Sequence, residues 1–462
     1  MLSLSRFRLP LVAIQRRSLT TNTKRVRGPQ PIASHEVINL ELDIKNPEAK
    51  KVYTVRPVTF WMDKVLETEN KKSLTDNVFE DRPQIMKKMS DSYIEELLPF
   101  KSSPDLLDKY VTAKGTIRIG KILEDLDALA GAISYKHIDT FTPGPPVTIV
   151  TASVDRMEIL MPSTVEDMKI SGHVAYVGSS SMEVFAKVET IPRYDPSKPH
   201  FSESNPEFSI TKPTPNTVIF ARFTMVARNS ITGKAVKVNP MVLENAEEKK
   251  LFMYAEDCKT RKRLAGEKDL SKIPPTADER LTIHDIYIKN LKDEETGPNP
   301  NTVPMESTCL QSVFLMQPQN RNIQNNVFGG YLMRRAYELA HSTGSMLVKS
   351  QISCLALDEI VFKKPVSVGS LLNLSSKVIY SQGEPSKSFQ VSVTARVNNI
   401  EAGTSYVTNT FFFTFASNDK AVPKVLPKTY AESILYLEGK RRREYGLKAK
   451  KSLLALMQGS SE

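Results

Sequence analysis

Two segments of the chain resemble each other, and this internal repeat limits the possible fold more than any other feature. Each begins with a short apolar stretch, reaches a glycine and continues with apolar residues at helical spacing. The first is TIRIGKILEDLDALAGAISYKH, from Thr116, and the second is NNVFGGYLMRRAYELAHSTGSM, from Asn325. The apolar stripes are formed by Ile122, Leu123, Leu126, Leu129, Ala130 and Ile133 in the first helix, and by Leu332, Met333, Ala336, Leu339, Ala340 and Met346 in the second. We therefore predict two equivalent helices, offset by roughly 200 residues.

The residues that follow each helix predict strands in both halves. In the first half they are ISGHVAYVG, SMEVFAKVETI and a closing TVIFARFTMVA. In the second half they are LLNLSSKVIYS, SFQVSVTARVNN and a closing YVTNTFFFTFA. Alternating, β-branched and aromatic residues are typical of antiparallel strands. The sequence thus predicts an α+β fold made of two copies of one unit, which pair with each other as the subunits of a homodimer would.

The N-terminal segment differs in composition from the rest. Its first 27 residues contain seven basic residues with Ser and Thr between them, and the first acidic residue is Glu36. An Arg-rich, Ser-rich and acid-free N-terminus is typical of a mitochondrial transit peptide, which we place at residues 1–35. The formal net charge is +11, so a chain beginning after Arg27 carries +4 (11 − 7). Most of the basic excess therefore belongs to this segment, and we predict no nucleic-acid partner.

Other features exclude several classes of protein. No apolar run reaches the roughly 18 to 20 residues that cross a bilayer, so we expect no integral membrane segment. The three cysteines, Cys258, Cys309 and Cys354, are far apart and match neither a metal site nor a disulfide framework. We predict no metal. The chain has no Gly-x-Ser-x-Gly motif and no phosphate-binding loop, and the segment Gln317 to Phe328 contains no histidine.

Several motifs carry a resemblance to a known family. NRNIQNNVFGGYLMRRAYELA, from Asn320, is similar to the N-x-x-x-x-x-F-G-G-x-L-M-R-x-A-Y-E-L-A block of the mitochondrial acyl-coenzyme A thioesterase 9 type. DSYIEELLPF, RIGKILEDLDALAG, FKKPVSVGSLL and PKTYAESILYLEG also resemble that family, from about Ser90 to Gly439. The resemblance implies a tandem double hotdog fold, in which each half is a long helix wrapped by an antiparallel sheet.

The resemblance and the composition together predict the organisation of the chain. We expect a mitochondrial transit peptide at 1–35, a first hotdog domain at 90–230, a helical linker at 231–303, a second hotdog domain at 304–430, and a C-terminal helix with a basic tail at 431–462. The implied activity is hydrolysis of acyl-CoA to free fatty acid and CoA in the mitochondrion, most simply its matrix, without a cofactor. The alternative is an acyl-CoA or acyl-carrier binding protein that has kept the fold without turnover. We also expect the double-hotdog chain to form a homo-oligomer.

A thioester hydrolase needs donors for an oxyanion. N–H groups at a helix N-terminus are unpaired and lie at the positive end of the helix dipole, and glycine lets a substrate oxygen approach closely. Gly329 and Gly330 begin the second helix, whereas the first has Ile119 and Gly120. We therefore predict that Gly330 N–H donates to the oxyanion, with Gly329 contacting the substrate. The alternative is that the two glycines only allow tight packing of the helix into the sheet.

The resemblance places the remaining catalytic groups on different halves. The family's loop asparagine falls on Asn322, and its helix carboxylate falls on Asp127, seven residues after Gly120. The equivalent positions in the opposite halves are Thr112 and Tyr337, so we expect one composite site and one degenerate site. Asp127 is predicted to be the general base, with the direct nucleophile as the alternative role, and Asn322 to orient the water or the thioester.

Further residues are candidates for substrate contacts. Glu124 is the alternative carboxylate to Asp127 and is included in the predicted substrate site. Lys363 and Lys364, together with Arg334 and Arg335 on the second helix, are candidates for the CoA phosphates; exposed basic residues are as commonly a solvated surface.

Overall fold

The computed structural model describes residues 82–139, 146–191, 211–265, 270, 273–297, 299–321 and 326–458. The chain divides into two units, Met1–Lys50 and Lys51–Glu462, and every described residue belongs to the second. The predicted transit peptide, which stays a prediction, lies outside the described residues. None of the described helices is long and apolar enough to cross a membrane.

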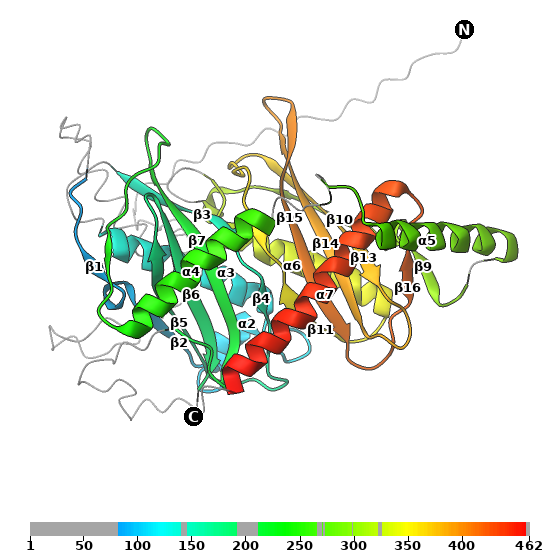
Figure 1. Cartoon of the computed structure of the whole chain (residues 1–462), viewed down its shortest axis with the longest axis horizontal. Coiled ribbons are helices and arrows are strands. Elements are labelled where there is room, and N and C mark those ends of the chain that lie inside the picture. Colours follow the sequence, from blue (N-terminus) through cyan, green and yellow to red (C-terminus); the bar gives the residue numbers. More distant parts are fainter. Residues whose placement is uncertain are drawn as a thin grey trace, which may run out of the picture. The chain divides into compact units, whose positions relative to one another are not determined.

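The first half is a six-stranded antiparallel sheet packed on α3 (Ile119–Ile138) (Figure 1). The strand order is β12-β3-β7-β6-β5-β2. The strands are β2 (Ile94–Leu98), β3 (Val147–Val154), β5 (Met168–Val177), β6 (Ser181–Thr190), β7 (Thr217–Asn229) and β12 (Ile360–Val361). The strands predicted from the alternating pattern correspond to β5, β6 and β7.

The second half repeats this arrangement around α6 (Gly329–Val348). Its strand order is β10-β13-β14-β15-β11-β4, again with every pair antiparallel. The strands are β4 (Met157–Glu158), β10 (Leu310–Leu315), β11 (Ile352–Leu357), β13 (Leu371–Ser381), β14 (Ser388–Asn399) and β15 (Thr404–Ser417). The α+β class and the duplicated unit predicted from the repeat are both confirmed.

Each half contributes one short strand to the sheet of the other half. The β4 strand, from the first half, pairs with β11, and β12, from the second half, pairs with β3. The register is reciprocal: Leu357 pairs with Met157, and Ile360 pairs with Val154. Because the two strands are exchanged, the halves are joined by backbone hydrogen bonds as well as by side-chain contacts.

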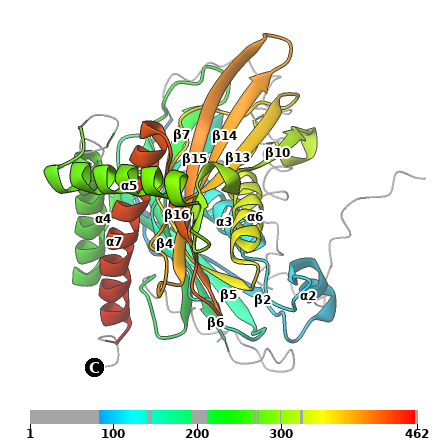
Figure 2. The ribbon, with the colours of Figure 1, turned by 90° about the vertical axis from the view of Figure 1, so that its right-hand side faces the viewer.

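The two long helices pack side by side, on one side of the sheets (Figure 2). All six predicted stripe residues of α3 are fully buried, and five of the six in α6 are buried. Met346 is the exception, with 63% of its surface exposed. At 3.6 residues per turn Met346 lies about 120° around the helix from Ala340, and it is in the last turn of α6, so including it in the buried stripe was wrong.

The helices after each half cover the outer face of a sheet. In Figure 1, α4 (Ala246–Ala265) lies over the first sheet, and α7 (Tyr430–Gln458) lies over the second. The α4 helix packs on β5 through Ala255, which lies against Ala175 and Phe185. The neighbouring residue Val174 faces the main core instead, as expected for side chains that alternate along a strand.

The remaining elements are short or peripheral. They are α2 (Pro104–Tyr110), α5 (Ala277–Thr296), a pair formed by β1 (Lys87–Lys88) and β8 (Met241–Val242), and a pair formed by β9 (Thr302–Pro304) and β16 (Lys424–Leu426). Thr276 and Glu279 form a capping box at the start of α5. The Nε and Nη2 groups of Arg441 on α7 donate to the Glu279 carboxylate at 2.6 and 2.7 Å, which joins α5 to α7.

Removing the Arg441 guanidinium should destabilise the protein at neutral pH more than in acid. Hydrogen bonds from Arg441, and smaller contributions from Thr276, lower the pKa of Glu279 from 4.5 to about 2. The pair therefore contributes stability above pH 4.5, and this contribution is lost as the pH falls towards 2. We expect the difference in urea-unfolding free energy between wild type and Arg441→Gln to shrink over that range. Lys440→Gln removes a neighbouring charge as a control; a difference between wild type and Arg441→Gln that does not change with pH would contradict the assignment.

Candidate active site

The carboxylate of Asp127 lies where the two halves meet. Asp127 projects from α3, and only 5% of its surface is exposed. Its Oδ1 accepts a hydrogen bond from the Thr151 hydroxyl at 2.7 Å, and its Oδ2 accepts one from the Gly330 N–H at 2.6 Å. Thr151 belongs to the same half as Asp127, and Gly330 belongs to the other half. The site is therefore shared between the two copies of the repeat.

A β-bulge positions Thr151. The β3–β7 register shifts between Thr151 and Ser153, and a bulge of this kind re-aims the neighbouring side chain. The bulged residue, Ala152, accepts a hydrogen bond from the N–H of Phe362 at 2.9 Å. The Phe362 ring in turn lies against Gly329, where an added Cβ would be 3.0 Å from the ring. The exchanged strand β12 thus leads directly into one wall of the site.

Thr151 and Phe362 were both missed by the sequence analysis. Thr151 is 24 residues from Asp127, and no helical or strand period relates them. Its only signal in the sequence is a polar β-branched residue in an otherwise apolar strand, which is too common to indicate a site.

The glycines at the start of α6 allow the two helices to touch at backbone distance. A Cβ built on Gly330 would be 2.9 Å from Asp127 Cβ and 3.0 Å from both Cα and O of Glu124. No side chain fits there without moving α3. The Gly330 N–H is one of the N–H groups that helix geometry leaves without an intrahelical acceptor, and it lies at the positive end of the α6 dipole.

This contact changes the role predicted for Gly330. We expected its N–H to donate to an oxyanion, but in the structure it donates to the Asp127 carboxylate. Gly330 therefore anchors the carboxylate, and an N–H in this bond is not free for a substrate oxygen. The preceding N–H, that of Gly329, belongs to the same helix terminus, and an added Cβ on Gly329 would be 3.5 Å from Asp127 Oδ2.

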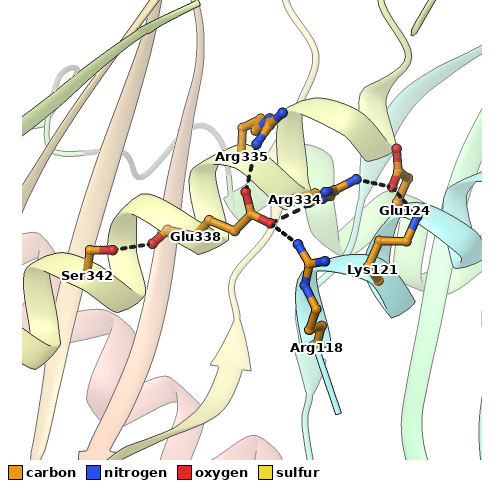
Figure 3. Close-up of polar contacts among 7 residues, drawn as sticks. All are labelled: Arg118, Lys121, Glu124, Arg334, Arg335, Glu338 and Ser342. Carbon is orange, nitrogen blue, oxygen red and sulfur yellow. Dashed lines mark hydrogen bonds and ion pairs between the residues drawn. The ribbon is translucent and has the colours of Figure 1, made fainter. Parts of the chain in front are cut away.

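The two neighbouring carboxylates, Asp127 and Glu124, have opposite electrostatic environments. Burial raises the pKa of Asp127; the hydrogen bonds from Thr151 and Gly330 partly offset this, and Glu124 adds to it. Burial also acts to raise the pKa of Glu124, but Lys121 and Arg334 outweigh it, so that this pKa is lowered. Glu124 accepts hydrogen bonds from both cations at 3.0 Å (Figure 3). Asp127 is therefore the better proton acceptor of the two.

The equivalent place in the other half has lost its carboxylate. Tyr337 occupies the position on α6 that Asp127 occupies on α3, and its ring packs on Phe413 and Phe415 at centroid distances of 5.9 and 6.1 Å. Cys354 precedes a bulge in β11 as Thr151 does in β3. Burial raises the pKa of the Cys354 thiol, which works against a thiolate. This supports the prediction of a single working site.

Other predicted residues are placed as follows. Asn322 lies outside the described residues; the flanking Arg321 and Val327 form an isolated β-bridge. Lys363 and Lys364 follow β12 and are exposed, with the Lys364 ammonium 5.0 Å from the Tyr406 ring centroid.

The two arginines of α6 are engaged with carboxylates. Arg334 binds Glu124 and Glu338, and Arg335 binds Glu338 (Figure 3). Their predicted role as ligands of the CoA phosphates stays a prediction. Among the described residues, no group of three His, Cys, Asp or Glu side chains could hold a metal ion.

Two helix-and-sheet halves that share one carboxylate site define this chain as a double hotdog protein, as the sequence predicted. No family model matches it. It is 37% identical over 442 residues to acyl-coenzyme A thioesterase 9, mitochondrial, of Homo sapiens, covering 94% of each chain. Acyl-coenzyme A thioesterase 10, mitochondrial, of Mus musculus is 37% identical over 87% of this chain and 89% of its own. The chain belongs to the mitochondrial acyl-coenzyme A thioesterase 9 family, which confirms the resemblance.

Matches to solved structures cover a shorter part of the chain. An acyl-CoA hydrolase from Staphylococcus aureus, in complex with butyryl coenzyme A, coenzyme A and coenzyme A disulfide, is 24% identical. The match covers 34% of this chain and 98% of that chain, with a TM-score of 0.31.

Replacing Gly330 by alanine should cost more stability than the same change at Gly120. At Gly330 the new Cβ meets backbone atoms of Glu124, whereas at Gly120 it meets the Arg334 and Tyr337 side chains at 3.2 and 3.3 Å. The two side chains near Gly120 can adjust their rotamers, whereas the backbone of Glu124 can move only if α3 moves. We expect Gly330→Ala to lower the free energy of unfolding by about 1–3 kcal/mol, with a smaller loss for Gly120→Ala, as measured by chemical denaturation. Equal losses of unfolding free energy in the two variants would contradict the prediction that Gly330 has the tighter contact.

Proposed function

We propose that the protein hydrolyses acyl-CoA to a free fatty acid and CoA, with Asp127 as the general base at the site between the two halves. The observation that carries this proposal is a buried carboxylate held by donors from both halves at a glycine-bordered helix N-terminus. Family membership supports it, because relatives that cover most of the chain are named acyl-CoA thioesterases.

The geometry allows Asp127 to act on a water molecule. Each carboxylate oxygen accepts one hydrogen bond, and a carboxylate has further acceptor sites, so a water can still be bound. The two donors hold the group in one orientation, and burial makes it a stronger base than an exposed aspartate. Asp127 takes a proton from the water as its oxygen attacks the thioester carbonyl carbon. When the C–S bond then breaks, the proton passes to the departing CoA sulfur.

The developing oxyanion requires donors other than Gly330. We assign this role to the Gly329 N–H at the same helix terminus, because the first N–H groups of a helix lack intrahelical acceptors. The Asn322 amide, assigned through the family motif, is a second donor or a ligand of the water. We prefer Asp127 to Glu124 as the base because Lys121 and Arg334 bind the Glu124 carboxylate and lower its pKa, which makes it a weaker proton acceptor.

Location and assembly belong to the same proposal. The mitochondrial names of the relatives agree with the location predicted from the N-terminal segment. We place the reaction in the matrix, where a cleaved transit peptide delivers its protein. We also propose a homo-oligomer, because β10 at the sheet edge exposes Val313 and Leu315, with 58% and 49% of their surfaces accessible.

The first test is release of free thiol from a panel of acyl-CoAs. We expect the wild type to release CoA, and Asp127→Asn to lower kcat by about 10²- to 10⁴-fold, because the amide cannot accept the proton. Asn322→Ala should also reduce turnover. Tight acyl-CoA binding without thiol release by the wild type would instead support the alternative, a non-catalytic binding protein.

The second test concerns the hydroxyl of Thr151. Its hydrogen bond lowers the pKa of Asp127, so Thr151→Val should raise that pKa. A base works only when deprotonated, and the acid limb of the kcat/KM profile should therefore move to higher pH. Thr148→Val, a change to another buried threonine of β3, serves as the control. An acid limb that stays in place, or moves to lower pH, would argue against Asp127 as the base.

A further inference from the structure

The contacts between α3 and α6 show that the two helices are related by a two-fold axis. Gly120 faces Arg334 and Tyr337, and Gly330 faces Glu124 and Asp127. The differences 330 − 120, 334 − 124 and 337 − 127 are all 210. Each contact on one helix therefore has its counterpart on the other, and Glu124 and Arg334 are the same position in the two copies of the repeat.

The two equivalent residues, Glu124 and Arg334, contact each other across the two-fold axis. Nη1 of Arg334 lies 3.0 Å from Oε2 of Glu124, and about a fifth of each side chain is exposed, 19% and 23%. In a pair of identical copies, a residue that meets its own counterpart would be the same residue twice. Two glutamates or two arginines there would repel each other. The observed pair is attractive only because the two copies carry opposite charges.

The pair is the centre of a network that crosses between the helices (Figure 3). Lys121 binds Glu124 from within α3, and Glu338 binds Arg334 from within α6, at 3.0 and 3.2 Å. Arg118, which precedes α3, reaches across to Glu338 at 2.9 Å. Two charged contacts between the helices, Glu124 with Arg334 and Arg118 with Glu338, thus resist sliding of α3 along α6.

We infer that Glu124 and Arg334 are positioning residues: their opposite charges favour the pairing of unlike halves and hold α3 and α6 in the register in which Asp127 receives the Gly330 N–H. Only unlike halves place Asp127 opposite a glycine pair, because two first halves would lack Gly329 and Gly330, and two second halves would lack the carboxylate. The effect on turnover rests on the proposed function, whereas the effect on stability does not.

The pair also adjusts the charge around the base. From α3, Asp127 faces Glu124 one turn earlier; from β3 it faces the Thr151 hydroxyl, and from α6 the Gly330 N–H. Arg334 acts by neutralising Glu124. Loss of Arg334 leaves an extra negative charge near Asp127, and loss of Glu124 removes one. The two changes break the same ion pair but act on Asp127 in opposite directions.

The experiment uses full-length variants and two kinds of measurement. Glu124→Gln and Arg334→Gln should both lower the melting temperature. The acid limb of kcat/KM should move to lower pH for Glu124→Gln and to higher pH for Arg334→Gln, which a purely structural role would not produce. Single reversal by Glu124→Arg should lower kcat/KM by about 10- to 100-fold through misplacement of the helices. Adding Arg334→Glu should restore much of the lost melting temperature.

The controls separate the possible failures. Lys212→Gln breaks an exposed ion pair with Glu247 on α4. It should change neither the melting temperature nor the acid limb of kcat/KM. If the wild type released no thiol, the proposed function would fail, while the melting temperatures would still test the pairing. If the wild type were active but the two neutral variants shifted the acid limb in the same direction or not at all, or if the double reversal restored nothing, the inference would be wrong. If Glu124→Arg does not fold, the acid limbs of Glu124→Gln and Arg334→Gln still test the inference.

Discussion

The close contact between α3 and α6 is the interaction on which the rest of the structure depends. At Gly330 the helices are so close that an added Cβ would lie 3.0 Å from Cα and O of Glu124, and this closeness brings an N–H group to the Asp127 carboxylate. A helix N-terminus is positive and short of acceptors, and a buried carboxylate is short of donors. The Gly330 N–H gains an acceptor and the Asp127 carboxylate gains a donor in the same hydrogen bond. The site therefore forms when the two halves pack together.

The exchanged strands fix the relative orientation of the two halves and so maintain the contact between α3 and α6. Because β4 and β12 each belong to the sheet of the opposite half, the halves cannot rotate about the helices without breaking backbone hydrogen bonds. The same exchange places the Phe362 ring beside Gly329 and the bulge beside Thr151. The geometry of the base is thus supported from α6, from β3 and from the segment after β12.

Duplication within one chain lets the two copies diverge, and the site uses this freedom. The position equivalent to Asp127 is Tyr337 in the second copy, where it packs in an aromatic cluster with Phe413 and Phe415. The position equivalent to Glu124 is Arg334, its ion-pair partner. A homodimer would carry two equal sites and a like-charged pair on its axis. The fused chain can keep one carboxylate, fill the other place with apolar side chains, and pair opposite charges where the copies meet.

The sequence by itself determined the repeated unit, the helices and most of the strands, because their apolar periods are local. It also identified Asp127 and the Gly329–Gly330 junction, through a motif and a count of positions. Only the tertiary structure decided what the Gly330 N–H binds, because that partner is 203 residues away and lies on the other half. Thr151, Phe362 and the pairing of Glu124 with Arg334 came from the fold for the same reason: contacts across a two-fold axis leave no periodic trace along the chain.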